Sequence, residues 1–478
     1  MFKKLTLKEW QQFSSIDIDF HNRLTILTGA NGAGKTTILK ILAMRCGWDK
    51  LNFISQYSNE NDEKEFRYSS GINDKYLKYP YYIRYPYHIN SNWFGNWNQR
   101  SNISDILRPR ETIFNHQQKS QQLWNFSSNQ INKYYNWFSQ INNNHKKSFK
   151  TKFLVGKITS DTITSDLQVD NIIENPVYKI EFRESFKEKG LYAQSHRPLF
   201  SYKRITERPT NIMSREEIYT KYFSYHQSLL CDEARDHEKL APSFLIKEAL
   251  INLAYSVHGE AQNENSKQLL EKYASILGQV LPKKLGFKRI KIMFPEVIFV
   301  TETGSFSIDA VSGGIASIID MTWQLYMFAD SSEKFVALID EPENHLHPEL
   351  QKELLSNLLK AFPNVQFIVS THNPLIITSV KESSVYVLRY NEDNKVFSEE
   401  LDCVNKAANA NAILSNVLGI DSTIPTWAEQ ILERIVTKYS QKEFTAENLN
   451  SLKEELEIID LGNHVPQAIL ELAEKQDD

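Results

Sequence analysis

Short apolar runs of strand length alternate along the chain with longer stretches in which apolar residues recur at helical spacing. We interpret three of these runs as buried strands: 23–28, 335–341 and 365–370. Residues 37–44, which follow the first run after the intervening residues 29–36, have a helical pattern, and Ile319, Trp323 and Tyr326 recur at helical spacing before the second. Strands and helices in this alternation predict an α/β fold.

The remaining patterns add antiparallel strands and helices to this core. We expect antiparallel strands, including one hairpin near the end, in four segments: 153–158, 177–182, 384–389 and 395–397. Residues 211–280 have a helical pattern, which returns from Val404 onward. The last stretch, 441–478, is acidic, with ten Asp and Glu against three Lys. It either binds a partner or buttresses the rest of the fold.

The segment between residues 51 and 150 interrupts the α/β pattern. It has no sustained heptads, which argues against a coiled coil. Nine aromatic residues fall within 76–97, and Pro80 and Pro86 argue against a helix there. Such an insert packs onto the core or docks a protein, and the alternative is stacking on nucleic-acid bases. Residues 111–144 predict one or two amphipathic helices.

Residues 29–36, Gly-Ala-Asn-Gly-Ala-Gly-Lys-Thr, fit the pattern of a phosphate-binding loop between a predicted strand and a predicted helix. Glycines allow backbone angles that turn successive N–H groups toward one anion, and the helix N-terminus adds partial positive charge. Lys35 would reach the outer phosphates, and the Thr36 hydroxyl would bind Mg²⁺. We therefore predict that these residues bind a nucleotide: Gly29, Ala30, Asn31, Gly32, Ala33, Gly34, Lys35, Thr36 and Thr37.

Two acids end the second apolar run, and a histidine follows the third. Asp340 would lie at the carboxyl end of its strand, beside the glycine loop, where it can hold Mg²⁺ through water. Glu341 would polarise the attacking water. His372 would hydrogen-bond the γ-phosphate and sense its loss, whereas the simpler alternative is a satisfied loop histidine. The sequence therefore predicts three catalytic residues: Lys35, Glu341 and His372.

Composition narrows the class of protein. The 478 residues carry a formal net charge of −4, so no strong overall field draws nucleic acid or an anionic membrane. Three widely spaced cysteines form neither a disulfide framework nor a metal motif, which favours a cytoplasmic location. We see no signal peptide, and no apolar run approaches the length of a membrane span, so we expect no membrane partner.

The order of glycine loop, Ser-Gly-Gly before a helix, acidic strand and histidine strand resembles the ABC-type ATPases of the SMC, RecF and OLD kind. The resemblance is closest over 1–50 and 300–380. It implies an ABC-type ATPase head: a mixed sheet with a P-loop core, an antiparallel β subdomain and a helical lobe, here with an aromatic-rich insert and a helical C-terminal region. Such heads bind ATP between two copies. The residues that would contact the γ-phosphate held by Lys35 of a partner subunit are Ser312, Gly313 and Gly314.

The run 340–348, Asp-Glu-Pro-Glu-Asn-His-Leu-His-Pro, resembles the variant typical of the OLD-like group. By that likeness Glu343, His345 and His347 lie on the dimer-facing loop. The two histidines also suggest zinc, but no third ligand has a recognisable spacing, so hydrogen bonding within the turn is favoured. One departure is that the family's usual Arg falls on Gln11. A basic contact to the nucleotide is then missing, or comes from Arg23 or another residue.

The resemblance also implies a Q-loop that touches Mg²⁺ and water, for which Gln194 is the candidate and Gln56 the competitor. His196 and Arg197 would serve the same site, a neighbouring subunit, or a structural turn fixed by Pro198. The implied metal set is Thr36, Asp340 and Gln194. The expected organisation is an N-terminal core part (1–60), the insert (61–150), the β subdomain with the Q-loop (151–210), the helical lobe (211–305), the second core part (306–400) and the acidic helical region (401–478).

The likeness extends to the stand-alone OLD-like ATPases of Septu, PARIS and retron-linked loci. It implies an antiviral switch that uses ATP and Mg²⁺, pairs as a homodimer or higher even homo-oligomer, and controls a companion nuclease or toxin. No D-x-D motif follows His372, so a nuclease domain of the OLD type is not expected in this chain. The rivals are a RecF-like or SMC-like DNA-repair ATPase and a scaffold that holds ATP with negligible turnover. The basic cluster within 283–291 contacts nucleic acid or is a solvated face.

Overall fold

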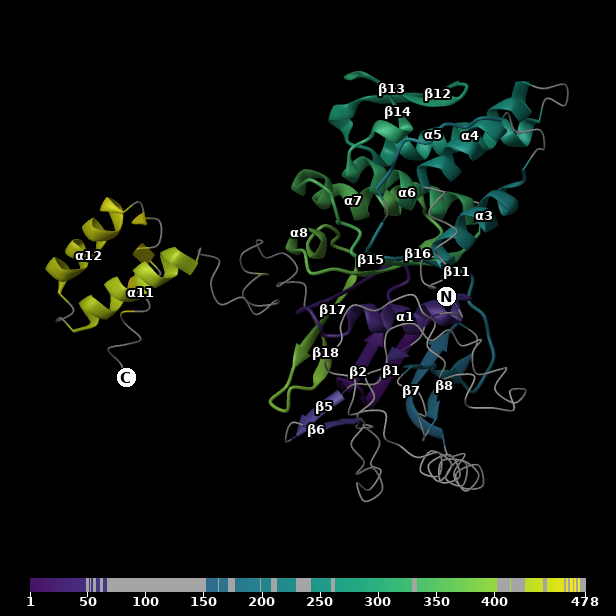
Figure 1. Ribbon diagram of the computed structural model, residues 1–478. Coiled ribbons are helices and arrows are strands. Elements are labelled where there is room, and N and C mark those ends of the chain that lie inside the picture. The colour runs from purple at the N-terminus through teal and green to yellow at the C-terminus, as the bar shows by residue number, and fades with distance from the viewer. Residues whose placement is uncertain are drawn as a thin grey trace, which may run out of the picture. The chain divides into compact units, whose positions relative to one another are not determined.

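The computed structural model (Figure 1) describes most of the chain outside the predicted insert. The described residues are 1–48, 51, 53–54, 57–60, 63–66, 152–161, 163–170, 177–197, 199–207, 213–228, 242–258, 263–328, 333–401, 413, 426–441, 445–459, 461–462, 465–466, 468–469 and 472. The predictions for 76–97, 111–144 and Gln56 lie outside them. The chain divides into two compact units. One comprises Met1–Leu51, Gly156–Asp166 and Phe182–Asp478, and the other Asn52–Val155 and Leu167–Glu181.

A mixed sheet forms the framework of the fold. Its strand order is β10-β8-β7-β1-β2-β18-β17-β3-β16-β15-β11. In chain order the strands are β1 (Phe2–Trp10), β2 (Phe13–Asp19), β3 (Leu24–Gly29), β7 (Lys152–Ser160), β8 (Thr164–Asp170), β10 (Glu181–Phe182), β11 (Gly190–Ala193), β15 (Phe335–Asp340), β16 (Val365–Ser370), β17 (Ser384–Tyr390) and β18 (Val396–Glu400). Strands β17, β3, β16, β15 and β11 pair in parallel, whereas β1 pairs antiparallel with β2 and β7, and β17 antiparallel with β18.

The parallel part of the sheet explains the continuous apolar runs in the sequence. Every residue of β3, β15 and β16 is buried, as expected for strands covered on both faces. The register places Asp340 opposite Ser370, and Ser370 opposite Leu27 of β3. The carboxyl ends of these three strands therefore meet at one edge of the sheet.

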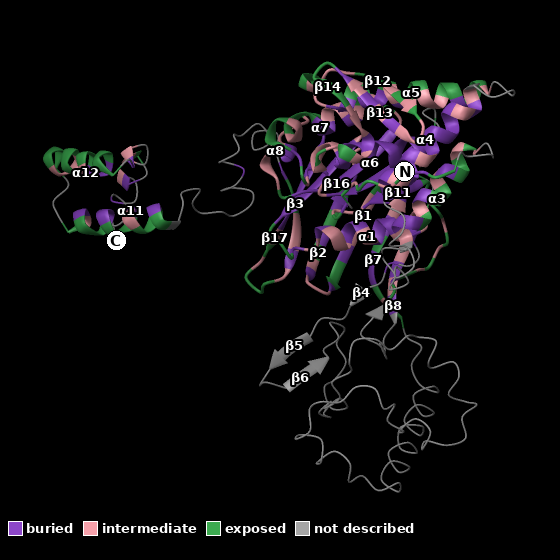
Figure 2. Cartoon of the chain, turned by 45° about the horizontal axis from the view of Figure 1, so that its top comes forward, coloured by how far each residue is buried: buried purple, intermediate pink, exposed green. Residues whose placement is uncertain are grey.

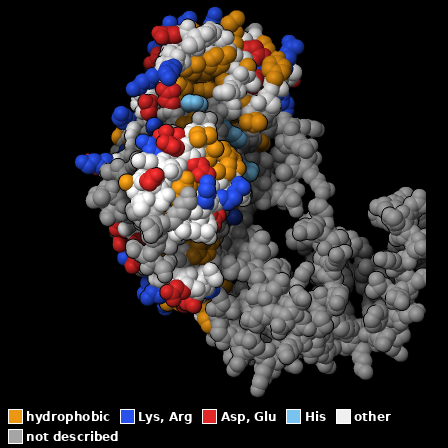
Figure 3. Space-filling model, turned by 90° about the vertical axis from the view of Figure 1, so that its left-hand side faces the viewer, with side chains coloured by type: hydrophobic (Ala, Val, Ile, Leu, Met, Phe, Trp, Pro, Cys, Tyr) orange, Lys and Arg blue, Asp and Glu red, His pale blue; other side chains and the backbone are white. Residues whose placement is uncertain are grey.

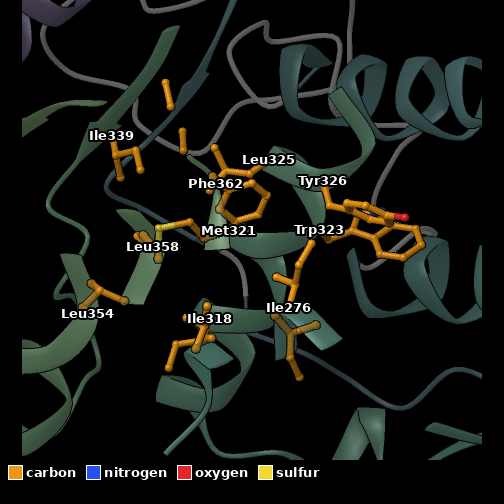
Figure 4. Close-up of a cluster of buried hydrophobic side chains, with 14 of the residues drawn as sticks. Ile276, Ile318, Met321, Trp323, Leu325, Tyr326, Ile339, Leu354, Leu358 and Phe362 are labelled. Carbon is orange, nitrogen blue, oxygen red and sulfur yellow. The ribbon is translucent and has the colours of Figure 1, made fainter. Parts of the chain in front are cut away.

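Helices follow the strands and pack into one apolar core. They are α1 (Lys35–Arg45), α3 (Arg215–Ser228), α4 (Pro242–His258), α5 (Glu264–Val280), α6 (Gly313–Phe328), α7 (Pro348–Ala361) and α8 (Pro374–Ile377). Helix α6 is buried along most of its length, and Figure 4 shows Ile318, Met321 and Leu325 of this helix among side chains of α5, α7 and β15. Figure 2 shows the same burial as purple through the centre of the fold. For the described residues of 211–280, α3, α4 and α5 confirm the helical prediction.

The expected helical lobe also contains a small sheet that the sequence pattern did not predict. Strands β12 (Phe287–Met293), β13 (Glu296–Thr301) and β14 (Gly304–Ser307) pair antiparallel. The basic cluster falls on β12 and on the 3-10 turn before it, with Arg289 and Lys291 exposed. Lys284 forms an ion pair of 2.8 Å with Glu349. Strand alternation therefore turns part of the cluster to solvent while Ile290 and Ile292 pack against the core.

Two C-terminal helices and two short strand pairs lie outside the main sheet and its helices. Helices α11 (Thr426–Ser440) and α12 (Ala446–Ile458) share an apolar cluster of their own, which includes Leu432, Val436, Leu452 and Leu456. Short strand pairs are β4 (Phe53–Ile54) with β9 (Val177–Tyr178), and β5 (Tyr57–Glu60) with β6 (Glu63–Phe66). The predicted α/β class, with its mixed sheet, antiparallel strands, helical lobe and C-terminal helices, is confirmed. Among the helices that the structure describes, none has the length and apolar character that a membrane crossing requires.

Candidate nucleotide-binding site

The glycine loop, residues 29–36, joins the end of β3 to the start of α1. Its glycines have backbone φ angles of 136° at Gly29, 84° at Gly32 and 93° at Gly34. A Cβ on Gly29 would collide with the main-chain oxygen of Leu388 on β17, and a Cβ on Gly34 would lie 2.5 Å from the ring of Phe13. The loop conformation therefore requires glycine for backbone strain and for space.

Gly34→Ala is expected to distort this loop and to weaken nucleotide binding by at least about 10-fold, because forcing a methyl group into a packed site costs about 1–3 kcal/mol in addition to the left-handed backbone. The measurement is the affinity for a fluorescent nucleotide, together with the melting temperature. Gly304→Ala is the matched control, since Gly304 has a φ of 136° but its Cβ would meet nothing within 4 Å. Equal nucleotide affinities for the two variants would contradict a steric requirement at the loop.

Lys35 is held at the loop by the loop's own carbonyl groups. Its Nζ donates to the main-chain oxygens of Gly29 at 2.8 Å and of Ala30 at 3.0 Å, and the residue is 7% exposed. Burial lowers the pKa of Lys35, while the charges of Glu341 and Asp340 oppose that shift. The ammonium group therefore lies between the loop and a group of carboxylates, where a phosphate would meet both its charge and its hydrogen-bond donors.

Thr36 and Asp340 form a hydroxyl–carboxylate pair beside the loop. Thr36 Oγ1 donates to Asp340 Oδ2 at 2.9 Å, and the Ser370 hydroxyl donates to Asp340 Oδ1. Burial raises the pKa of Asp340, and these two hydrogen bonds counteract the rise. Within the described ranges no group of three or more His, Cys, Asp or Glu side chains is arranged to hold a metal. A hydroxyl with one carboxylate nevertheless fits Mg²⁺, which in nucleotide sites usually takes its other ligands from phosphate and water.

Glu341 and His372 lie directly against each other. Glu341 Oε1 is 3.3 Å from His372 Nδ1, and Glu341 Oε2 accepts from Asn344 Nδ2 at 3.0 Å. The backbone of Glu341 is in the left-handed region, with a φ of 46°. The Glu341 N–H donates to the main-chain oxygen of Ser370 at 2.9 Å. The structure thus brings together two residues for which the sequence indicated separate roles, and it adds Asn344, which no motif singled out.

The remaining side chains of the acidic loop, residues 340–348, have distinct environments. Glu343 is 4% exposed and accepts from the Thr371 hydroxyl through Oε1, and burial raises the pKa of Glu343. His347 Nδ1 accepts from the Glu349 N–H at 3.4 Å and caps the start of α7. His345 has a φ of 68°, and its main chain lies beside α6.

The signature residues, Ser312, Gly313 and Gly314, lie at the start of α6. The Ser312 oxygen accepts the first helical bond, from the Ala316 N–H at 2.8 Å. The Ser312 side chain is exposed. A Cβ on Gly314 would lie 2.7 Å from the His345 oxygen, so the acidic loop passes close to this helix end. No hydrogen bond joins the signature residues to the glycine loop within the described part of the chain.

Gln194 follows β11 at the edge of the sheet where the acids lie. Because Ala193 pairs with Ile339, Gln194 is level with Asp340. Its Nε2 is buried and has no hydrogen-bond partner among the described residues. The next residues bind the acidic loop: the Ser195 oxygen accepts from Asn344 Nδ2 at 3.1 Å, and Arg197 donates to main-chain oxygens of the loop. The competitor Gln56 lies outside the described residues.

The side chain of Arg23, which the sequence offered as a candidate nucleotide contact, extends to the C-terminal end of α7. Its guanidinium donates to the Leu359 oxygen at 2.8 Å and the Phe362 oxygen at 3.1 Å. The side chain that reaches the glycine loop from the turn between β1 and β2 is instead that of Gln12. Its Nε2 is so close to Gly34 that a Cβ built on this glycine would lie 2.5 Å from it. Gln11, the position on which the family's usual Arg falls, is one residue earlier in this turn.

A phosphate-binding loop, a hydroxyl–carboxylate pair and a Glu–His pair at the carboxyl ends of the parallel strands of a mixed sheet define a P-loop nucleotide-binding protein. The chain belongs to the AAA ATPase domain family, whose model matches residues 1–377. It therefore carries an ATPase domain.

The regions of sequence similarity to individual proteins are shorter than the region that the family model matches. The Septu protein PtuA of Bacillus mycoides is 28% identical over 173 residues, which cover 34% of this chain and 24% of that protein. The Retron Vc95 probable ATPase of Vibrio cholerae is 37% identical over 79 residues, 16% of this chain and 15% of that protein. The chain thus spans less than a third of either relative's length. The SMC head domain from Thermotoga maritima aligns with a TM-score of 0.36 and 12% identity, over 84% of this chain and 99% of that one.

Proposed function

We propose that this protein is a Mg²⁺-dependent switch that binds and hydrolyses ATP, pairs two copies around the nucleotide and controls a companion effector in a prokaryotic antiviral defence system. The observation that carries the hydrolytic part is the convergence of Lys35, Thr36, Asp340 and Glu341 at one edge of the sheet. The defence context and the effector, a nuclease or a toxin, are inferred from the Septu and retron relatives.

Each residue of the site would have a separate role in binding or hydrolysing ATP. The glycine loop and Lys35 would bind the phosphates, and Thr36 and Asp340 would hold Mg²⁺, which neutralises charge on the phosphate oxygens. Glu341 would orient the attacking water and accept its proton. His372, in contact with Glu341, would hydrogen-bond the γ-phosphate. Gln194 has a buried amide without a partner among the described residues, so it would bind either the water or Mg²⁺.

The position of the signature residues supports the proposed pairing of two copies. Ser312 is exposed, and its side chain has no hydrogen-bond partner in the described part of the chain. It also lies at a helix N-terminus, which favours an anion. The nucleotide held by one glycine loop would therefore be completed by Ser312 of a second copy, in a homodimer or a higher even oligomer.

Mixing two inactive variants tests this pairing. Lys35→Ala loses phosphate binding, and Ser312→Arg blocks the signature face, so each variant alone is expected to be inactive. A mixed dimer contains one site with an intact loop from the Ser312→Arg copy and an intact signature from the Lys35→Ala copy. Random pairing of equal amounts should restore up to about a quarter of wild-type ATPase activity, since half of the dimers are mixed and each has one intact site. A mixture no more active than its parents would contradict the shared site.

A DNA-repair ATPase is the second candidate, and the exposed Arg289 and Lys291 of β12 favour it. On the face drawn in Figure 3, however, acidic and basic side chains are interspersed. DNA that stimulates hydrolysis in the absence of any companion protein, with a steep loss on adding salt, would support this candidate over the switch.

A further inference from the structure

Arg197 is a buried cation whose donors are directed at main-chain oxygens of the acidic loop. The residue is 6% exposed. Its guanidinium donates to the Asp340 oxygen at 3.1 Å and to the Glu341 oxygen at 3.3 Å. A third bond of 3.2 Å reaches Ser317 Oγ on α6. One side chain therefore connects the main chain of both acids to the helix that begins at the signature residues.

Burying this cation is costly, so its position needs a physical reason. Burial lowers the pKa of Arg197, and the charges of Asp320 and of the acids at 340, 341 and 343 offset that effect. No carboxylate lies within ion-pair distance of Arg197 among the described residues. Because the guanidinium is planar and carries several donors in a fixed fork, it can hold three acceptors at set angles, which an ammonium cannot do.

The main chain that Arg197 holds is strained at Glu341. A non-glycine residue with a φ of 46° is disfavoured and persists only where its surroundings impose it. The Glu341 N–H is bound to Ser370, and its oxygen is bound to Arg197. Asn344 bridges the Glu341 carboxylate to the Ser195 oxygen. The loop after β11 thus orients Glu341 through both its main chain and its side chain.

The other end of this connection is rigid. Asp320 of α6 is 1% exposed and accepts from the Tyr222 hydroxyl of α3 and from Gln324 Nε2 at 2.9 Å. Apolar side chains of the same helix, α6, pack against side chains of α5 and α7 (Figure 4). A helix packed in this way moves as a body, so a displacement at the signature residues reaches Ser317, one turn further along.

We propose that Arg197 is a positioning residue that holds Glu341 in its hydrolytic orientation and couples it to α6. The inference rests on the proposed ATPase function. Engagement of Ser312 with a second copy's nucleotide would displace α6, and Arg197 would transmit that displacement to Glu341 of the same chain. Hydrolysis at the two sites of a dimer would therefore be cooperative.

Arg197→Lys in the full chain tests the positioning role. It keeps the charge but loses the fork, so kcat is expected to fall by about 10- to 100-fold, within the range of a misplaced catalytic base. Affinity for a non-hydrolysable ATP analogue should change by less than about 3-fold, because Lys35, Thr36 and Asp340 keep their side chains. Guanidinium ion added to Arg197→Ala should restore part of kcat. Ser317→Ala removes only the bond to α6, and it should lower the cooperativity of hydrolysis with ATP concentration more than kcat.

Arg23→Lys is the matched control, because Arg23 also donates to main-chain oxygens but lies at the end of α7. It should lower the melting temperature and leave kcat unchanged. Wild-type kcat in Arg197→Lys, or a parallel loss of kcat, affinity and melting temperature without guanidinium rescue, would overturn the inference. Absence of hydrolysis by the wild-type protein would instead overturn the proposed function, so the two failures are distinguishable.

Discussion

Lys35→Ala is expected to abolish measurable ATP binding. The ammonium group is already directed at the glycine loop by bonds of 2.8 and 3.0 Å, and it would exchange these carbonyl oxygens for phosphate oxygens. Hydrogen bonds to charged groups contribute about 1.5–3 kcal/mol each, so losing two weakens binding by about 10²- to 10⁴-fold. Calorimetric titration with Mg·ATP measures this directly.

Two comparisons complete the Lys35 experiment. Lys40→Ala, on the same helix, removes a lysine outside the loop and should bind ATP as the wild type does. In the native host, Lys35→Ala should also remove protection against phage, scored as plating efficiency. Unchanged ATP affinity would refute the assignment of the glycine loop, whereas lost affinity with unchanged plating would refute only the defence role.

Glu341→Gln is expected to bind ATP normally but to hydrolyse it about 10²- to 10⁴-fold more slowly, the loss typical of removing a general base. The amide has the shape of the carboxylate and can still accept from Asn344, but it cannot take a proton from water. Closed dimers should accumulate, because the step that opens them follows hydrolysis. Turnover and size-exclusion chromatography in Mg·ATP measure both effects.

Glu349→Gln provides the control for the Glu341 variant. Glu349 also belongs to this region of the chain, at the first turn of α7, but it is an exposed partner of Lys284 at 2.8 Å. It should behave as the wild type in both assays. Should Glu341→Gln hydrolyse ATP at the wild-type rate, and that rate be substantial, the base lies elsewhere. Equally negligible rates for the wild type and Glu341→Gln would instead support the scaffold that holds ATP without turning it over.

Local patterns were sufficient for the strands and loops of the nucleotide site. Glycines 29, 32 and 34 predicted a loop with unusual backbone angles, and all three have positive φ. The apolar runs ending at Asp340 and Ser370 predicted buried strands, and the structure pairs them in parallel, since strands buried on both faces lack polar alternation. The small sheet β12–β14 escaped prediction because its exposed basic residues masked a short alternating pattern.

What the sequence by itself determined is the set of chemical groups: a glycine loop with the pattern of a phosphate-binding loop, a hydroxyl and a carboxylate suited to Mg²⁺, and a glutamate followed by a histidine strand. Only the tertiary structure decided which groups touch. The contact of Glu341 with His372, the placement of Gln12 rather than Gln11 at the glycine loop, and the bonds of Arg197 to α6 and the acidic loop depend on strand register and helix packing. Those are set by contacts between residues far apart in the chain, which local spacing does not encode.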